Sequence, residues 1–129
     1  MNLLKVKYII KKCFKCGAII KVINDCTCED CGIKCCGENM KEITPNSVDA
    51  AIEKHVPEYQ IEENKIQIKV NHVMEEEHYI EWISIVSNNE EYITYLKPGK
   101  EASIKYKYIP GSIIYAYCNK HGLWKRDVE

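Results

Sequence analysis

The stretch ASIKYKYIPGSIIYAYC, residues 102–118, decides the fold class of this chain. Two runs rich in isoleucine and tyrosine, 102–109 and 112–118, flank the turn signal PGS. Each run has the composition of a β-strand, and the proline and glycine between them predict a reversal of the chain. The stretch therefore predicts two consecutive strands, and the second of them ends at Cys118.

Similar runs lie upstream of this stretch. KIQIKV (65–70) alternates strictly between polar and apolar residues, and YIEWISIV (79–86) and EYITYL (91–96) are further strand candidates. The turn signals SNNEE and KPGKE separate them. Short strands at a spacing of about ten residues predict an antiparallel β-sandwich.

One short helix is expected before these strands, in SVDAAIEKHVP (47–57). Its apolar residues have helical spacing, Ser47 is a candidate N-cap, and Pro57 stops the run. We expect a turn or two of helix, with His55 near its end.

The N-terminal part of the chain is organised differently. LKVKYII (4–10) and AIIKVI (18–23) are strand candidates, but the span 1–38 is too small to fold on a hydrophobic core alone. A metal cross-link would replace the missing core. We therefore predict an all-β protein with a metal-stabilised module at 1–38 and a β-sandwich domain at 39–129. The segment ENMKEITPN (38–46) is the expected linker.

Composition excludes several classes of function. The chain has 129 residues, a formal net charge of −1 and a pI near 6.4. This charge balance argues against a nucleic-acid-binding protein. The longest uncharged run, 108–119, is too short to span a bilayer, and lysines at 5 and 7 interrupt any secretory signal. We expect a cytoplasmic protein that binds neither nucleic acid nor membrane.

The cysteines and histidines are segregated along the chain. Seven of the eight cysteines lie within 13–36, whereas Cys118 stands alone and all four histidines follow residue 54. In a cytoplasmic protein such cysteines indicate metal or redox chemistry rather than disulfides. The segregation predicts two sites of different character.

Cys118 and the four histidines are candidate ligands of one metal ion. His55, His72, His78 and His121 all fall at the ends of predicted elements, where a sandwich gathers its loops. A thiolate with several imidazoles suits zinc, copper or iron. Structural zinc uses four ligands rather than five, and a blue-copper site would need a methionine that does not follow His121. The third interpretation is a mononuclear iron with one open coordination position.

Spacing alone leaves the other cysteine site open. CFKCG (13–17) and CEDCG (28–32) both have the form of a metal-binding knuckle. Paired, Cys13, Cys16, Cys28 and Cys31 would form a zinc-ribbon or rubredoxin-like site. The adjacent pair in CCG (35–37) offers the alternative.

Three motifs carry a resemblance to a known family. The segments CCGENMKEITPNSVDAAIEKHVP, VNHVMEEEHYIEWI and CNKHGLW look like those of the desulfoferrodoxins, the two-iron superoxide reductases, and the resemblance runs from about Tyr8 to Lys125. It implies a desulforedoxin-like module with an iron held by four cysteines. It further implies an immunoglobulin-like β-sandwich with a catalytic iron that reduces superoxide to hydrogen peroxide.

The resemblance also implies roles for particular residues. His55, His72, His78 and His121 become equatorial iron ligands, and Cys118 becomes the axial thiolate. Glu53 and Lys54 match an acidic–basic pair beside the vacant position, where Lys54 attracts superoxide. Val73 departs from the family, which commonly has proline after this histidine, and it is expected to loosen the His72 loop.

For the first site, the resemblance implies Cys13, Cys16, Cys35 and Cys36 as iron ligands, with Cys28 and Cys31 as the alternative pair. The stretch between the two pairs is longer than the family usually has, and the purpose of Cys26, Cys28 and Cys31 does not follow from it. This iron has no open position. It either holds the module together or relays electrons.

The resemblance extends to partners. It implies a rubredoxin-like electron donor and a homodimer. Zinc is expected to be able to replace iron during expression. The rival interpretation is a metal-binding electron carrier without turnover, and the Glu53–Lys54 pair favours the enzyme.

Overall fold

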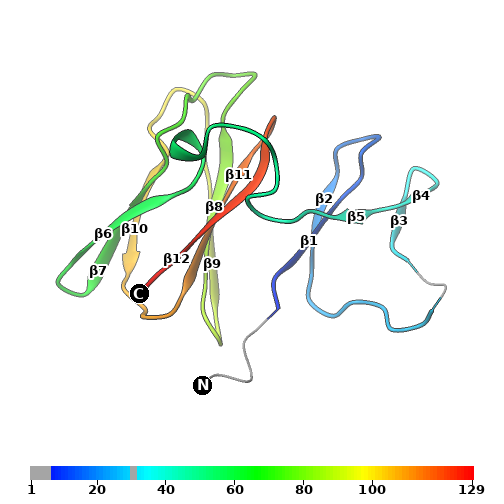
Figure 1. Ribbon diagram of the computed structural model, residues 1–129, viewed down its shortest axis with the longest axis horizontal. Coiled ribbons are helices and arrows are strands. Elements are labelled where there is room, and N and C mark those ends of the chain that lie inside the picture. Colours follow the sequence, from blue (N-terminus) through cyan, green and yellow to red (C-terminus); the bar gives the residue numbers. More distant parts are fainter. Residues whose placement is uncertain (1–6, 30–31) are drawn as a thin grey trace. The chain divides into compact units, whose positions relative to one another are not determined.

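The computed structural model describes residues 7–29 and 32–129. Its contacts divide the chain into two compact units, Met1–Thr44 and Pro45–Glu129 (Figure 1). The division falls beyond the predicted boundary at 38. Each unit is described by itself.

The first unit consists of short antiparallel strands. One sheet has the order β2-β1-β5, and β3 and β4 form a separate hairpin. The strands are β1 (Ile9–Lys12), β2 (Ile19–Val22), β3 (Lys34–Cys35), β4 (Glu38–Asn39) and β5 (Lys41–Glu42). The strand predicted at 18–23 is confirmed. The one predicted at 4–10 lies partly outside the described residues, and β1 begins near its end.

The segment expected to be a linker, 38–46, is largely structured. β5 pairs with β1 through Lys11 and Glu42, and Ile43 donates its N–H to the Ile10 carbonyl. The side chain of Met40 is buried. Sequence analysis missed this pairing because a single buried methionine within a polar run shows no strand periodicity.

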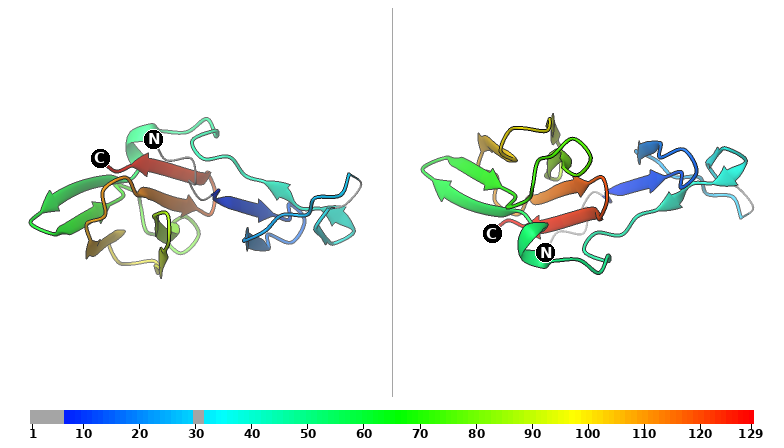
Figure 2. Two further views of the ribbon diagram at one scale, coloured as in Figure 1. Left: turned by 90° about the horizontal axis from the view of Figure 1, so that it is seen from below. Right: turned by 90° about the horizontal axis from the view of Figure 1, so that it is seen from above.

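The second unit is an immunoglobulin-like antiparallel sandwich of two sheets, as predicted. One sheet has the order β10-β7-β6 and the other β12-β11-β8-β9 (Figures 1 and 2). The strands are β6 (Glu58–Glu62), β7 (Lys65–Lys69), β8 (Ile80–Val86), β9 (Glu91–Tyr95), β10 (Ser103–Lys107), β11 (Ile113–Cys118) and β12 (Gly122–Asp127). All the strands predicted between 65 and 118 are present.

Alternating side chains of both sheets form the core. The buried cluster contains Ile66 and Ile68 of β7, Ile83 and Ile85 of β8, and Ile114 of β11, which point inward because successive residues of a strand face opposite sides. Cys118 belongs to the same cluster and is fully buried. The core therefore extends up to the candidate ligand that ends β11.

Two strands of the sandwich were not predicted. β6 carries mostly polar, exposed residues, and β12 ends in the charged run KRD. Both are edge strands, and each becomes a strand by pairing with a stronger neighbour, β7 or β11. Their own sequences contain too little apolar periodicity to indicate this.

The predicted helix is shorter in the structure, where it is a single 3-10 turn, η1 (Ile52–Lys54). It begins after Ala51, so the predicted N-cap at Ser47 is wrong. Pro57 ends the segment as expected, and the next residue opens β6. A short turn suffices because its function in the fold is to place His55, which directly follows it.

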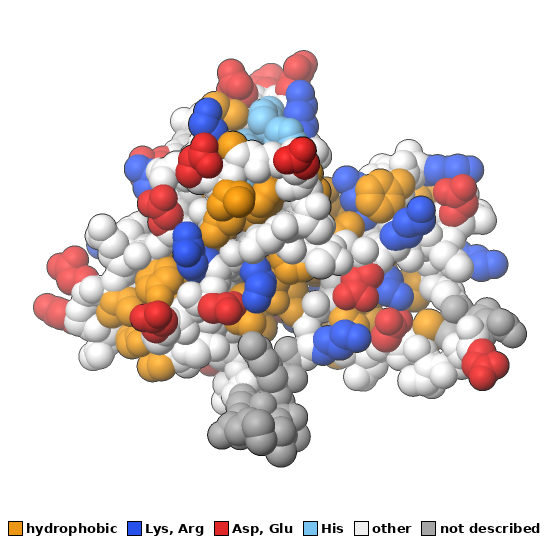
Figure 3. Space-filling model, in the orientation of Figure 1, with side chains coloured by type: hydrophobic (Ala, Val, Ile, Leu, Met, Phe, Trp, Pro, Cys, Tyr) orange, Lys and Arg blue, Asp and Glu red, His pale blue; other side chains and the backbone are white. Residues whose placement is uncertain are grey.

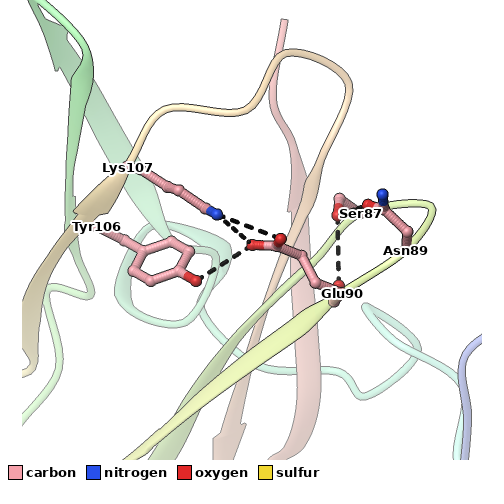
Figure 4. Close-up of polar contacts among 5 residues, drawn as sticks. All are labelled: Ser87, Asn89, Glu90, Tyr106 and Lys107. Carbon is pink, nitrogen blue, oxygen red and sulfur yellow. Dashed lines mark hydrogen bonds and ion pairs between the residues drawn. The ribbon is translucent and has the colours of Figure 1, made fainter.

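One polar cluster links the two sheets at the edge formed by β9 and β10 (Figure 4). The Glu90 carboxylate accepts hydrogen bonds from Tyr106 Oη at 3.2 Å and from Lys107 Nζ at 3.2 Å. The Glu90 carbonyl accepts the Ser87 N–H at 2.9 Å. Beside this cluster, the rings of Tyr92 and Tyr106 stack with centroids 4.1 Å apart.

Replacing Glu90 with glutamine is expected to weaken the acid dependence of stability. The hydrogen bond from Lys107 lowers the pKa of Glu90 below its ordinary value. A lowered pKa in the folded state stabilises the fold at neutral pH, and this contribution is lost as the pH falls through the folded pKa. Glu90→Gln should lower Tm at pH 7 by at most about 4 °C. The difference between the Tm at pH 7 and the Tm at acid pH should therefore be smaller than in the wild type. Glu101→Gln, which removes an exposed ion pair with Lys69, is the control and should change less. An equal effect of both changes would contradict the prediction.

Candidate metal centres

Three separate segments bring five candidate ligands to one end of the sandwich (Figure 1). His55 follows η1, and His72 and His78 lie in the connection between β7 and β8. Cys118 ends β11, and His121 directly precedes β12. The sequence prediction grouped these five residues, and the structure brings all five together.

The donor atoms of the five side chains converge. The ligand atoms all lie within 4.8 Å of one another. His55 Nε2 is 3.1 Å from His121 Nδ1, and Cys118 Sγ is 3.4 Å from His72 Nε2. These separations place one imidazole nitrogen of each histidine and the sulfur around a common centre.

The four imidazole rings form a closed cycle. His55 contacts His72, His72 contacts His78, His78 contacts His121, and His121 contacts His55, with centroid distances of 4.5–5.0 Å. Neighbouring rings are steeply inclined, at 68–89°. The cycle arranges the four imidazoles around one space that would fit a single metal ion, and His55 and His78 are not neighbours in it.

Hydrogen bonds fix which nitrogen of two of these rings faces the centre. The Nδ1 atom of His55 is 2.7 Å from the Ala51 carbonyl, and that of His72 contacts the Val73 carbonyl. A carbonyl only accepts, so both Nδ1 atoms carry the proton and both Nε2 atoms present a lone pair. The Val73 carbonyl thus helps to orient His72, whose loop Val73 was expected to loosen.

His78 provides the clearest sign that an ion belongs here. Its Nε2 atom is buried and has no hydrogen-bond partner among the described residues. A buried polar atom without a partner is costly in a native fold. A metal ion bound by the five donors would satisfy it, so the residues present fit a metal of mixed nitrogen and sulfur ligation.

Burial favours the neutral form of the side chains in this cluster. It lowers the pKa of His55, His72 and His78, which keeps these rings neutral and able to bind metal. It raises the pKa of Cys118, although N–H groups of Lys120 and His121 act against the rise. A buried thiol of this kind becomes a thiolate when it meets a cation.

The structure argues against a copper site of the blue type. Met74, which lies between His72 and His78 in the sequence, uses its sulfur elsewhere, since Met74 Sδ accepts the Ile80 N–H at 3.4 Å. Five donors also exceed the four of a structural zinc site. Of the three interpretations drawn from the sequence, a mononuclear iron with five protein ligands and one open position remains.

Sequence analysis gave no role to Trp124, which supports two members of the cluster. Its ring stacks on His55 with centroids 4.8 Å apart, and its indole N–H donates to the His121 carbonyl at 3.0 Å. It is 1% exposed and lies opposite Ala116 in the β11–β12 hairpin. The only sequence signal was its place in CNKHGLW, three residues after His121.

Glu53 and Lys54 lie in η1, directly before His55, and both are exposed. Their charges reach the cluster, because Glu53 raises and Lys54 lowers the pKa of His55. Figure 3 shows histidine side chains at the surface between basic and acidic side chains. The centre is therefore accessible from solvent on a side flanked by both signs of charge.

A second cluster lies in the first unit. The sulfur atoms of Cys13, Cys16, Cys35 and Cys36 lie within 4.8 Å of one another. Cys16 and Cys35 are 3.5 Å apart, and the adjacent Cys35 and Cys36 are 3.9 Å apart. Cys36 adopts a φ of 54°, a left-handed conformation that lets two neighbouring side chains turn to the same centre.

Hydrogen bonds within the cluster shift the pKa values of Cys13 and Cys35 in opposite directions. Backbone N–H groups of Cys16 and Lys15 lower the pKa of Cys13 to about 7. Hydrogen bonding with Cys16, and then with Cys13, raises the pKa of Cys35 to about 12. A bound cation stabilises neighbouring thiolates, so this set of cysteines also fits a metal ion.

The structure places Cys35 and Cys36, rather than Cys28, beside Cys13 and Cys16. Cys26 and Cys28 are exposed, and neither belongs to the cluster. Cys31, the other member of the alternative pair, lies outside the described residues.

An immunoglobulin-like sandwich with four imidazoles and one thiolate at its end, together with a four-cysteine cluster, defines a two-metal protein of non-haem type. Comparison with known proteins gives the family. The desulfoferrodoxin family model matches residues 47–127, and the chain belongs to the desulfoferrodoxin family.

Its relatives match it along most of its length. The chain is 38% identical to the desulfoferrodoxin of Syntrophotalea carbinolica, covering 92% of this chain and 94% of the relative. It is 36% identical to that of Nitratidesulfovibrio vulgaris, with 94% and 97% covered. The superoxide reductase from Treponema pallidum has the same fold, with a TM-score of 0.69 at 21% identity over 93% of this chain and 98% of that one.

Within the described part of the chain, no helix is long and apolar enough to cross a membrane.

Proposed function

We propose that this protein is a superoxide reductase, which converts superoxide, one electron and two protons to hydrogen peroxide. The observation that carries the proposal is the convergence of the donor atoms of four imidazoles and Cys118 in a member of the desulfoferrodoxin family. One of these donors, the buried His78 Nε2, has no hydrogen-bond partner among the described residues. The solved neighbour from Treponema pallidum bears the name of this activity.

The catalytic iron would be held by five side chains, those of His55, His72, His78, His121 and Cys118. When bound, ferrous iron supplies the electron and an open coordination position for a small anion. The Cys118 thiolate donates electron density, as thiolates do in other iron sites. Trp124 and the carbonyls of Ala51 and Val73 hold the rings in place.

Lys54 and Glu53 are the proposed catalytic residues. Lys54 attracts the anionic substrate and orders a water that delivers a proton. Glu53 would approach the open position in the ferric resting state. Their exposure in η1, one and two residues before His55, supports both roles.

Replacing Lys54 with alanine is expected to slow the second-order reaction with superoxide about tenfold at low salt. The loss follows from removing the cation beside the site, so the rate should also depend less on ionic strength. Pulse radiolysis of the reduced protein at several salt concentrations measures both. Lys65→Ala, which removes an exposed lysine at the start of β7, is the matched charge control. An unchanged rate and salt slope for Lys54→Ala would remove the steering role.

The proposed function is tested on the full chain after metal analysis and, where zinc is found, reloading with iron. The optical spectrum should show a thiolate-to-iron band from each centre. Rapid, stoichiometric oxidation of the reduced histidine site by superoxide supports the enzyme. An iron-loaded protein that transfers electrons but does not react with superoxide would instead be a carrier.

The four-cysteine cluster is proposed to hold the second iron, which is structural or relays electrons. We propose residues 1–38 as the desulforedoxin-like iron module and 39–129 as the superoxide-reducing domain. The division of contacts near Thr44 is compatible with two modules. A rubredoxin-like electron donor, a homodimer and a cytoplasmic location complete the proposal.

Changing Cys26, Cys28 and Cys31 together to serine is expected to leave the absorption of the four-cysteine iron unchanged. The two described members of this set lie outside the cluster of sulfur atoms. Metal content and the visible spectrum check this. Cys35→Ser is the positive control and should lose the absorption. If the triple variant lost this absorption, the alternative cysteines would be ligands of the iron.

A further inference from the structure

Asn119 links the strand end that carries Cys118 to the segment that carries His78. Its backbone N–H donates to the Tyr79 carbonyl at 3.2 Å, and its Oδ1 accepts the Tyr79 N–H at 3.0 Å. Its Nδ2 donates to the Glu77 carbonyl at 2.9 Å. Asn119 therefore binds the residue on each side of His78.

A β-bulge explains why an asparagine side chain is needed here. Along β11 and β8, Tyr117 pairs with Trp82, but Cys118 pairs with Ile80, so one residue of β8 is skipped. Bulges redirect side chains and end regular pairing, often beside functional sites. Beyond the bulge, the Asn119 amide takes the place of a backbone carbonyl and continues the ladder to Tyr79.

Hydrogen bonds within the turn 75–78 fix its shape, but its position relative to β11 depends on other contacts. Glu75 and His78 exchange two backbone hydrogen bonds, of 3.0 and 3.1 Å, which close a tight turn through Glu77. These bonds fix the shape of the turn and not its distance from β11. The Asn119 backbone bond to Tyr79 supplies part of that second constraint, and the two side-chain bonds of Asn119 add to it on both sides of His78.

We infer that Asn119 is a positioning residue for the histidine-rich metal centre. Asn119 sets the placement of His78 Nε2 relative to Cys118 Sγ, and touches neither metal nor substrate itself. Outer-sphere groups that orient ligands change metal affinity by about 10- to 100-fold. The inference rests on the proposal that this cluster binds iron, but not on reaction with superoxide.

A matched asparagine separates positioning from general stability. Asn46 also forms two side-chain bonds to one backbone segment, since its Oδ1 accepts the Lys125 N–H at 2.9 Å and its Nδ2 lies 3.5 Å from the Lys125 carbonyl. Lys125 is not adjacent to a candidate ligand. Asn46→Ala should therefore destabilise the sandwich without releasing the metal.

The test compares iron-loaded full-length wild type with Asn119→Ala, Asn119→Asp and Asn46→Ala. The readout is the decay of the ferric thiolate band of the histidine site after adding EDTA, with the four-cysteine absorption as internal reference. Asn119→Ala should release iron at least about tenfold faster. Asn119→Asp keeps the acceptor for Tyr79 and loses the donor to Glu77, so its release should be intermediate.

Release from both Asn119 variants at the Asn46→Ala rate would overturn the inference. If Asn119→Ala does not fold, Asn119→Asp decides alone. A wild type that forms no thiolate band at this site would overturn the inference together with the ligand assignment. A wild type that forms the band but does not react with superoxide would refute only the proposed function.

Discussion

Replacing Cys118 with serine should abolish the thiolate-to-iron absorption of the histidine site and leave that of the four-cysteine site intact. Cys118 provides the only sulfur in this cluster, and a serine hydroxyl is not a charge-transfer donor of this kind. The visible spectrum of the ferric protein and its iron content measure the effect. We expect loss of the whole band and a much lower iron occupancy at this centre.

The position of Cys118 makes folding the necessary control. Its side chain is fully buried in the core cluster, so the serine hydroxyl is buried too and costs about 1–3 kcal/mol. Circular dichroism should show that the sandwich remains. Cys26→Ser, at an exposed cysteine outside both clusters, should retain both bands. A histidine-site band that persists in Cys118→Ser would exclude Cys118 as the axial ligand.

Replacing Trp124 with alanine is expected to lower the free energy of unfolding of the second unit by about 3–5 kcal/mol. The side chain is 1% exposed, so its removal leaves a cavity beside His55 and leaves the His121 carbonyl without its donor. Urea unfolding followed by the fluorescence of Trp82, the remaining tryptophan, measures the loss. The histidine site should also bind iron less tightly, because His55 loses its stacking partner.

Two variants separate the contributions of Trp124. Trp124→Phe keeps an aromatic ring on His55 and loses the indole N–H, so it should cost about 1–3 kcal/mol. Tyr95→Ala removes an aromatic ring that is 75% exposed and should change stability by no more than about 0.5 kcal/mol. A loss below about 1 kcal/mol in Trp124→Ala would show that the site does not depend on this packing.

The central strands could be predicted because each carries its own pattern. β7 alternates strictly, and β8 and β11 are long apolar runs bounded by turn signals. The five residues of the histidine site could be grouped for a related reason. Each lies where a predicted element ends, and the motifs around them are those of the desulfoferrodoxins.

The weak elements could not be predicted in the same way. β6, β12 and β5 depend on pairing with a neighbouring strand, since β6 and β5 are mostly polar and the second half of β12 is charged. The start of η1 was placed too early, because Ser47 has the residue type of an N-cap, whereas the turn begins after Ala51 without a side-chain cap. For the strands, partners distant in sequence rather than local preference decide the conformation.

The sequence by itself determined the all-β class, the histidine-rich set of candidate ligands and the resemblance to the family, since residue type and spacing carry this information locally. Only the tertiary structure decided how the donors meet. It placed Cys35 and Cys36 beside the first pair of cysteines and closed four imidazole rings into a cycle. It left the buried His78 Nε2 without a hydrogen-bond partner among the described residues. It also revealed Trp124 and Asn119, which act through other residues. The physical reason is that distances and hydrogen bonds between loops arise from sheet register and packing, which no single segment encodes.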